Sequence, residues 1–204
     1  MGSPEGGERE LILRAATRLF SALGYDGTSM EQITDAAGVE AATVSAHFTN
    51  KRELYLTVME EAHRVLAEVI VARADELRAA PPERRPEALH RFVDGYIDLC
   101  AEHPEVPALW MHRWLSDASD IDLEPLNAQP LTQRAIDSID ALTEPANADA
   151  QFTTYTMIWC IHGFTLSGVL DGTGQRRNAD DPRTLRRFRA HMHQLLDRVL
   201  RLSA

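Results

Sequence analysis

The sequence predicts an all-α protein in which a short N-terminal group of three helices precedes a larger helical part. Apolar residues recur at the three- and four-residue spacing of helices through most of the chain. The alternating Val, Ile and Thr runs with tight Gly turns that signal strands are missing from the sequence. Glycine, proline and capping residues divide the helical pattern at intervals typical of separate helices.

The first predicted helix runs from Glu10 to Leu23, and Gly24 follows it as a C-terminal glycine would. Its apolar face lies at helical spacing and comprises Leu11, Ile12, Ala15, Ala16, Leu19, Phe20 and Leu23. Residues 1–7, MGSPEGG, are expected to be flexible, because glycine, proline and charge cannot bury apolar surface.

Two short helices follow, separated by a glycine turn. Ser29 precedes the second helix and Gln32 lies three residues later, which is the spacing of a capping box. This helix is expected to stop near Ala37, and a third helix to run from about residue 41 to Phe48. Three short helices arranged in this way suggest a helix-turn-helix motif.

The rest of the chain reads as longer helices. Asn50 and Glu53 predict the cap of a fourth helix that continues to about Ala80, before a proline-rich break. Further helices are expected over residues 86–101, 104–115, 125–142, 150–170 and 182–202. The segment DGTGQRRNADD, residues 171–181, is expected to be a mobile loop.

Composition sets limits on function. The chain has 204 residues, 44% of them apolar, and a formal net charge of −10. No apolar run approaches the roughly 20 residues of a membrane helix, and no basic start precedes an apolar stretch as in a secretory signal. Cys100 and Cys160 lie in apolar stretches and are interpreted as reduced thiols of a cytoplasmic protein, although a redox pair stays open. The acidic balance is unfavourable for a nucleic-acid binder.

The sequence has no signature of an enzyme or of a metal or cofactor site. Among eight histidines there is no HExxH motif and no Cys/His cluster with ligand spacing. His191 and His193 are two residues apart, which places them on different sides of a helix. Neither a GxSxG motif nor a phosphate-binding loop is present. No enzymatic activity, cofactor or metal is therefore predicted.

The region from about Leu11 to Val58 resembles the DNA-binding module of the TetR family of bacterial transcriptional regulators. The matching words are ILRAATRLFSALGYDGTSMEQITDAAGV, then HF, and then K and L of HFTNKREL. The resemblance implies a helix-turn-helix domain over residues 8–57 and a helical ligand-binding and dimerisation domain over residues 58–204. It further implies a cytoplasmic homodimer that binds a near-palindromic operator and a small-molecule effector, with no membrane partner.

The third helix is the expected reading helix. Val44 and Phe48 are four residues apart and are expected to face the core, so that small and polar side chains face outward. Such side chains allow close approach to a groove and can contact thymine methyls, base edges or phosphates. Lys51, the only lysine in the chain, matches a phosphate-contacting position of the family. The predicted DNA-binding residues are Ser29, Ala41, Ala42, Thr43, Ser45, His47 and Lys51.

This segment departs from the family pattern in ways that lower the expected affinity for DNA. Glu40 stands where the family usually has Ser or Thr, and a glutamate caps poorly and repels phosphate. The family commonly has Gly at Ala42 and an aromatic residue at Ser45. Residues 1–64 hold six Lys and Arg against ten Asp and Glu. The prediction is weak non-specific binding with a shallow salt dependence.

Aromatic residues of the second part suggest an effector pocket for an apolar or aromatic molecule. They recur at helical spacing, which is equally typical of an ordinary core. The predicted ligand-binding residues are Phe92, Tyr96, Trp110, Trp114, Tyr155, Trp159 and His162. The apolar helix 150–170 is expected to be buried and, with the last helix, to form the dimer interface.

The function that the sequence favours is a ligand-responsive transcriptional regulator, most simply a repressor that an effector releases from its operator. The alternative is a small-molecule-binding dimer of the same fold in which specific DNA binding is weak or lost. Glu40, Ser45 and the acidic module favour this alternative.

Overall fold

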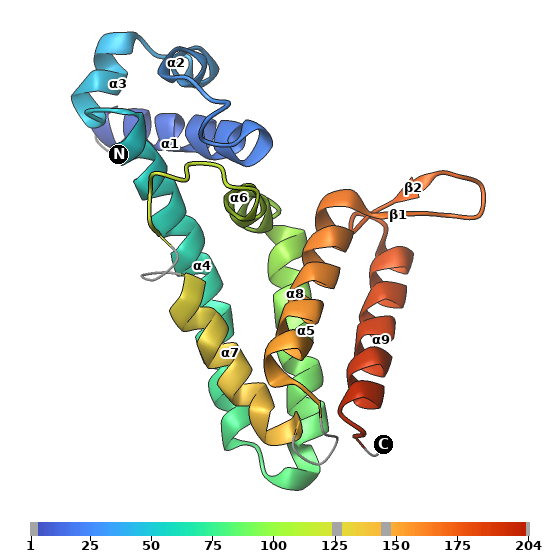
Figure 1. Cartoon of the computed structure of the whole chain (residues 1–204). Coiled ribbons are helices and arrows are strands. Elements are labelled where there is room, and N and C mark those ends of the chain that lie inside the picture. The colour runs from blue at the N-terminus through green and yellow to red at the C-terminus, as the bar shows by residue number, and fades with distance from the viewer. Residues whose placement is uncertain (1–3, 124–127, 144–147, 203–204) are drawn as a thin grey trace. The chain divides into compact units, whose positions relative to one another are not determined.

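The structure is a computed structural model, and it describes residues 4–123, 128–143 and 148–202. Helices dominate these ranges (Figure 1), so the all-α prediction is confirmed. The chain divides into two compact units. The N-terminal unit comprises Met1–Arg64 and Glu105–Asp122, and the C-terminal unit comprises Val65–Pro104 and Leu123–Ala204. This division differs from the predicted boundary at residue 57, because residues 105–122 return to the N-terminal unit.

The N-terminal unit contains α1 (Pro4–Leu23), α2 (Met30–Ala37), α3 (Ala41–His47), the start of α4 (Lys51–Ala79) and α6 (Glu105–Trp114). Helix α1 begins at Pro4, inside the segment that was expected to be flexible, and residues 1–3 lie outside the described residues. The other boundaries follow the predicted ones within a few residues. Helix α1 contacts α2, α3 and α6 and is therefore the centre of this unit.

The predicted caps of the short helices are present. The Ser29 hydroxyl accepts a hydrogen bond from the Gln32 N–H, and the Gln32 side chain accepts one from the Ser29 N–H, which completes the capping box. Gly38 ends α2 with a φ of 68°, a left-handed conformation that favours glycine. The Asn50 side chain accepts a hydrogen bond from the Glu53 N–H, 2.9 Å away, at the start of α4.

The core of the N-terminal unit is built from the apolar faces of these short helices. Ile12, Phe20 and Ile33 are fully buried, and the Phe20 ring meets the buried Tyr55 ring edge-on at 5.2 Å. Burial of each such side chain contributes about 1.5–3 kcal/mol. The predicted apolar face of α1 is thus buried at its centre, whereas Leu11 and Leu23, which were predicted on the same face, are 41% and 47% exposed.

Helix α6 and the turn that follows it are joined to the C-terminal end of α1 by polar contacts. The Asp117 carboxylate accepts hydrogen bonds from the N–H groups of Tyr25, at 2.7 Å, and Asp26, at 2.9 Å. His112 Nε2 lies 3.1 Å from the carbonyl oxygen of Ser21. The Arg113 guanidinium donates to carbonyl oxygens of the same turn, including that of Asp117. Residues 105–122 therefore form part of the folded N-terminal unit.

The C-terminal unit contains the remainder of α4, η1 (Pro82–Arg84), α5 (Arg85–Glu102), α7 (Ala128–Thr143), α8 (Ala150–Ser167) and α9 (Pro182–Val199). The first residues of the predicted helix 125–142 lie partly outside the described residues. Helix α5 contacts both α8 and α9, and α7 packs on α8. Helix α5 therefore lies in the middle of this core. Its buried residues are Ala88, Leu89, Phe92, Val93, Tyr96, Ile97, Leu99 and Cys100.

The segment expected to be a mobile loop instead forms a short antiparallel hairpin of β1 (Val169–Leu170) and β2 (Arg176–Arg177). The Asp171 carboxylate stabilises its turn by accepting hydrogen bonds from Thr173 and from the Gln175 N–H. Gly168 has a φ of 65°, and a Cβ there would lie 2.3 Å from the Arg177 carbonyl oxygen. Two-residue strands give too little alternation for a strand pattern to be recognised in the sequence.

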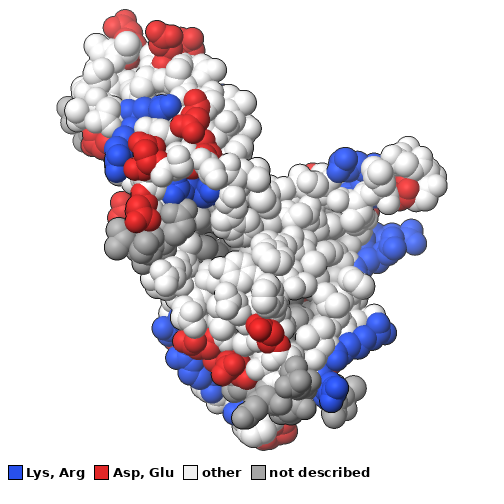
Figure 2. All heavy atoms as spheres, in the orientation of Figure 1, with Lys and Arg blue, Asp and Glu red and all other residues white. Residues whose placement is uncertain are grey.

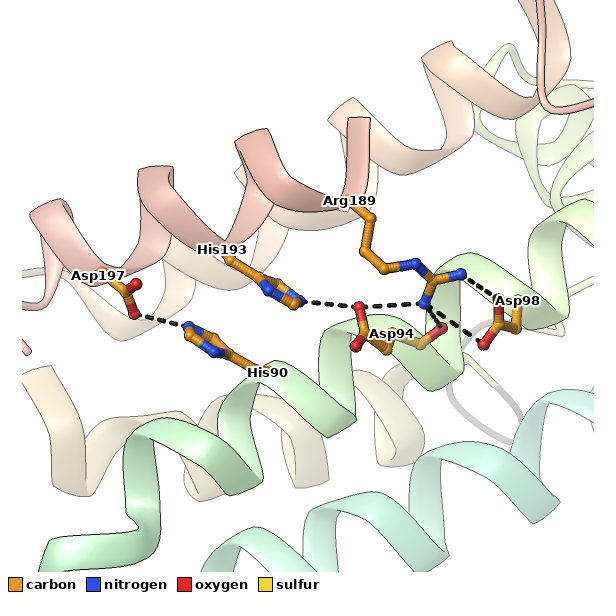
Figure 3. A network of polar contacts seen from close by, with 6 residues as sticks. All are labelled: His90, Asp94, Asp98, Arg189, His193 and Asp197. Carbon is orange, nitrogen blue, oxygen red and sulfur yellow. Dashed lines mark hydrogen bonds and ion pairs between the residues drawn. The ribbon is translucent and has the colours of Figure 1, made fainter. Parts of the chain in front are cut away.

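A ladder of polar contacts connects α5 with α9 (Figure 3). His90 Nε2 lies 2.7 Å from Asp197 Oδ1, and His193 Nε2 lies 2.8 Å from Asp94 Oδ1. The two imidazole rings stack in parallel with their centroids 4.1 Å apart. Arg189 extends the ladder through ion pairs with Asp94 and Asp98. The ladder places His193 toward α5, whereas His191 is exposed, as their spacing predicted.

Both cysteines are free thiols; Cys100 is buried and Cys160 is partly exposed. Among the residues that the structure describes, no helix has the length and apolar character needed to cross a membrane.

Candidate DNA-reading surface and effector site

Helix α3 presents a face of small side chains to solvent. Val44 and Phe48 are only 2% and 3% exposed, which confirms that they face the core. On the other side of the helix, Ala41, Ala42, Ser45 and Ala46 are exposed, and Thr43 and His47 are partly exposed. The exposed face has no side chain longer than serine apart from the partly covered His47. A backbone can approach a groove closely along such a face.

Ser29 lies at the N-terminus of α2 with its side chain exposed. Its hydroxyl oxygen accepts the hydrogen bond of the capping box, which leaves the hydroxyl hydrogen as a donor. The partial positive charge of the helix N-terminus adds to this donor. The position therefore suits contact with a phosphate, and the role stays a prediction.

Lys51 is engaged inside the N-terminal unit rather than extended into solvent. Its ammonium donates to the carbonyl oxygens of Tyr25, at 2.8 Å, and Thr28, at 2.9 Å. It also lies 4.1 Å from the centroid of the Tyr25 ring, within the range of a cation–π interaction. Two of its three N–H donors are thus used by the turn between α1 and α2. The structure assigns Lys51 an internal bracing role that the sequence interpretation did not foresee.

Charges near the reading helix are unfavourable for phosphate. Glu40 is the N-cap residue of α3, and its side chain makes no capping hydrogen bond, as expected for a glutamate. His47 Nε2 lies 3.8 Å from a carboxylate oxygen of Glu8. Figure 2 shows Asp and Glu spheres over the part of the molecule where Figure 1 draws α2 and α3. Glu40 and Glu8 therefore place negative charge beside α3, and Arg9, whose guanidinium carbon lies 5.4 Å from the centroid of the Phe48 ring, places positive charge there.

Three of the predicted effector residues lie in the core of the C-terminal unit. Phe92 and Tyr96 on α5 are buried, and Tyr96 Oη lies 2.6 Å from Nε2 of the buried His162 on α8. Burial lowers the pKa of His162 to about 4, so its imidazole is neutral at physiological pH. Burial also raises the pKa of Cys100, which hydrogen-bonds Tyr96, to about 12. The structure thus joins Tyr96, His162 and Cys100 into a neutral polar group within an apolar core.

The other four predicted effector residues are placed elsewhere. Tyr155 and Trp159 contact each other on α8 with ring centroids 5.5 Å apart, but Trp159 is 50% exposed. Trp110 and Trp114 lie on α6 in the N-terminal unit. Trp110 is buried, with an indole N–H that lacks an acceptor among the described residues, and Trp114 is 39% exposed. The seven residues therefore do not form one cluster within either unit.

Helix α8 is not fully buried within one chain, contrary to the expectation from its apolar sequence. Phe152 is 65% exposed, and Trp159 and Leu166 are also exposed. An open pocket of about 230 Å³ lies between α8 and α9, and its apolar lining includes Phe152, Met157, Leu195 and Val199. Helix α8 has no charged residue, so this exposed surface carries no formal charge.

Comparisons with known proteins agree with this architecture. Residues 12–58 match the family model described as bacterial regulatory proteins, tetR family. The transcriptional regulator BetI of Vibrio atlanticus is 22% identical over 91% of this chain and 90% of its own length. The regulator TcmR of Streptomyces glaucescens is 36% identical over 44% of this chain and 41% of its own length.

The fold is shared along nearly the whole chain with a solved structure. The structure of AibR in complex with isovaleryl coenzyme A and operator DNA superposes with a TM-score of 0.69 at 16% identity, covering 92% of this chain and 97% of AibR. At that identity the likeness concerns the fold alone. The module over residues 12–58 is therefore that of the tetR family of bacterial regulatory proteins, and the chain is similar along most of its length to a curated transcriptional regulator.

Proposed function

We propose that this regulator is a homodimeric repressor that reads a near-palindromic operator with α3 and is released by a small apolar or aromatic effector. The observation that carries the proposal is the outward face of α3. Its small side chains are supported from behind by the buried Val44 and Phe48. A helix presented in this way can enter a major groove, as the second helix of a helix-turn-helix does.

Operator reading would rest on hydrogen bonds and close contact more than on charge. Thr43, Ser45 and His47 would contact base edges or phosphates, and Ala41 and Ala42 would contact thymine methyls. Ser29 would hold a phosphate at the N-terminus of α2. Lys51 would add a phosphate contact only with its third N–H. This arrangement supports the prediction of a shallow salt dependence, since few phosphates are neutralised.

The apolar surface of α8 and α9 supports a homodimer built through these two helices. A second copy would cover Phe152, Trp159 and Leu166 and fill the open pocket beside Val199. Exposed patches of this kind in a globular protein mark interaction sites. Sedimentation or light scattering at micromolar concentration tests the proposal, and a monomer would contradict it.

The effector would be uncharged over much of its surface and would carry at least one hydrogen-bonding oxygen. The neutral Tyr96–His162 pair can hydrogen-bond such a group without the cost of burying a charge. The structure of AibR, which shares the fold, contains both isovaleryl coenzyme A and operator DNA, so a protein of this fold can bind a small molecule and DNA.

The first experiment is binding of the purified protein to the DNA that flanks its own gene, measured by anisotropy across a salt series with scrambled competitor. Competitor-resistant binding supports the regulator. Loss of specific binding both there and in a genome-fragment selection would favour the alternative, a ligand-binding dimer that has lost DNA reading. Effectors are then screened by quenching of tryptophan fluorescence, and tight ligands without a tryptophan signal would place the pocket elsewhere.

A further inference from the structure

Helix α9 carries a line of cationic and polar side chains on its solvent-facing side. The line, here called the α9 stripe, has the spacing i, i+4, i+8, i+11 and i+15 and consists of Arg183, Arg187, His191, Gln194 and Arg198. All five side chains are exposed, and none is a carboxylate. With a rise of 1.5 Å per residue, the three arginines span about 22 Å along one side of the helix.

The α9 stripe reverses the charge of the rest of the chain. Residues 182–204 hold six arginines and one aspartate, whereas the preceding residues hold 15 Lys and Arg against 30 Asp and Glu. The exposed Arg176 and Arg177 of the hairpin precede the stripe. Figure 2 shows Lys and Arg spheres along the edge of the molecule where Figure 1 draws the hairpin and α9.

Nothing described in this chain neutralises the stripe. Among the described residues, no carboxylate forms an ion pair with Arg183, Arg187 or Arg198, whereas Arg189 is paired toward α5. Of the two helices through which a second copy would dock, α8 has no charged residue, and the one carboxylate of α9, Asp197, is bound to His90.

We propose that the α9 stripe is a second DNA-binding surface, which binds the phosphate backbone of duplex DNA independently of its sequence. This proposal rests on the proposed function, which makes duplex DNA the polyanion that the protein meets. Guanidinium groups bind phosphate oxygens in bidentate fashion, and each neutralised phosphate releases a counterion. The stripe thereby compensates for the acidic reading module by retaining the protein on DNA outside its operator.

The test compares Arg187→Gln/Arg198→Gln with the charge-matched control Arg78→Gln/Arg84→Gln, whose arginines are exposed but lie outside the stripe. Both variants are made in the full chain and bound to a scrambled 30-base-pair duplex from 25 to 200 mM salt. The stripe variant is expected to lose about tenfold in affinity at 50 mM salt, and its log–log salt slope to become shallower by about 1 to 2. The control is expected to match the wild type.

Equal affinities and slopes for the two variants would overturn the proposal. Self-association at low salt that disappears in Arg187→Gln/Arg198→Gln would overturn it too, since the stripe would then bind an acidic surface of another copy. Failure of the proposed function gives a different result, which is loss of competitor-resistant operator binding. If both variants bind the operator specifically and have the same affinity for the scrambled duplex, the α9 stripe proposal is refuted and the proposed function stands.

Discussion

Replacing Lys51 with methionine separates an internal bracing role from a phosphate contact. The ammonium of Lys51 donates to two backbone carbonyl oxygens, at 2.8 and 2.9 Å. Hydrogen bonds to charged groups contribute about 1.5–3 kcal/mol each. Because the side chain is partly exposed, water replaces part of this interaction, and the expected loss in the free energy of unfolding is about 2 kcal/mol. For a protein of this size the loss lowers Tm by about 4–8 °C.

The assay is urea unfolding at a fixed protein concentration, because the proposed dimerisation would make apparent stability depend on concentration. Arg52→Met is the matched control, since Arg52 is the exposed neighbour and lies 4.0 Å from Asp120. This control removes the same charge but only a surface ion pair of about 0–1 kcal/mol. Operator binding of both variants is then measured across a salt series at a temperature where both are folded.

The bracing argument predicts a destabilised Lys51→Met protein whose salt slope for operator binding is close to that of the wild type. A variant with unchanged stability and a slope shallower by about 0.9 would refute it. Lys51 would then be a phosphate contact, as its position in the reading module suggested.

Four further changes test the reading surface, the proposed dimer face, the buried polar group and the contact of Asp117 with the turn after α1. Thr43→Ala should weaken operator binding by about 1–3 kcal/mol with little change in salt slope, as measured by anisotropy; an equal loss on scrambled DNA would contradict base reading. Trp159→Glu, which places a charge on the exposed face of α8, should shift the protein toward monomer in sedimentation, and an unchanged dimer would place the interface elsewhere. The pKa of His162 falls from 6.5 to about 4 on folding, so the unfolded state binds the proton more readily between these values. Stability should therefore be complete above pH 6.5 and fall by up to about 3 kcal/mol as pH drops toward 4, and His162→Phe should flatten this dependence in urea titrations. Asp117→Ala removes the acceptor of two backbone N–H groups and should cost about 2–3 kcal/mol in the free energy of unfolding; no loss in Tm would show that water replaces the carboxylate.

Local patterns in the sequence were sufficient to predict most of the helices and where they end. The capping box at Ser29, the left-handed Gly38 and the core positions Val44 and Phe48 depend on neighbours within one or two turns. Such interactions are encoded at fixed short spacings, so they can be recognised without the fold. The family of the reading module could be recognised for the same reason.

Long-range contacts were decided only by the tertiary structure. Lys51 and Tyr25 are 26 residues apart, and Asp117 lies more than 90 residues from the turn that it holds. His90 and His193 stack although nothing in their local sequences marks them as partners. The predicted aromatic set was divided between two units for the same reason, since helical spacing shows which side chains share a face but not what that face meets. The sequence by itself determined the helices, their caps and the reading module, whereas the partners of Lys51, Asp117 and the α5–α9 ladder depended on how distant segments pack.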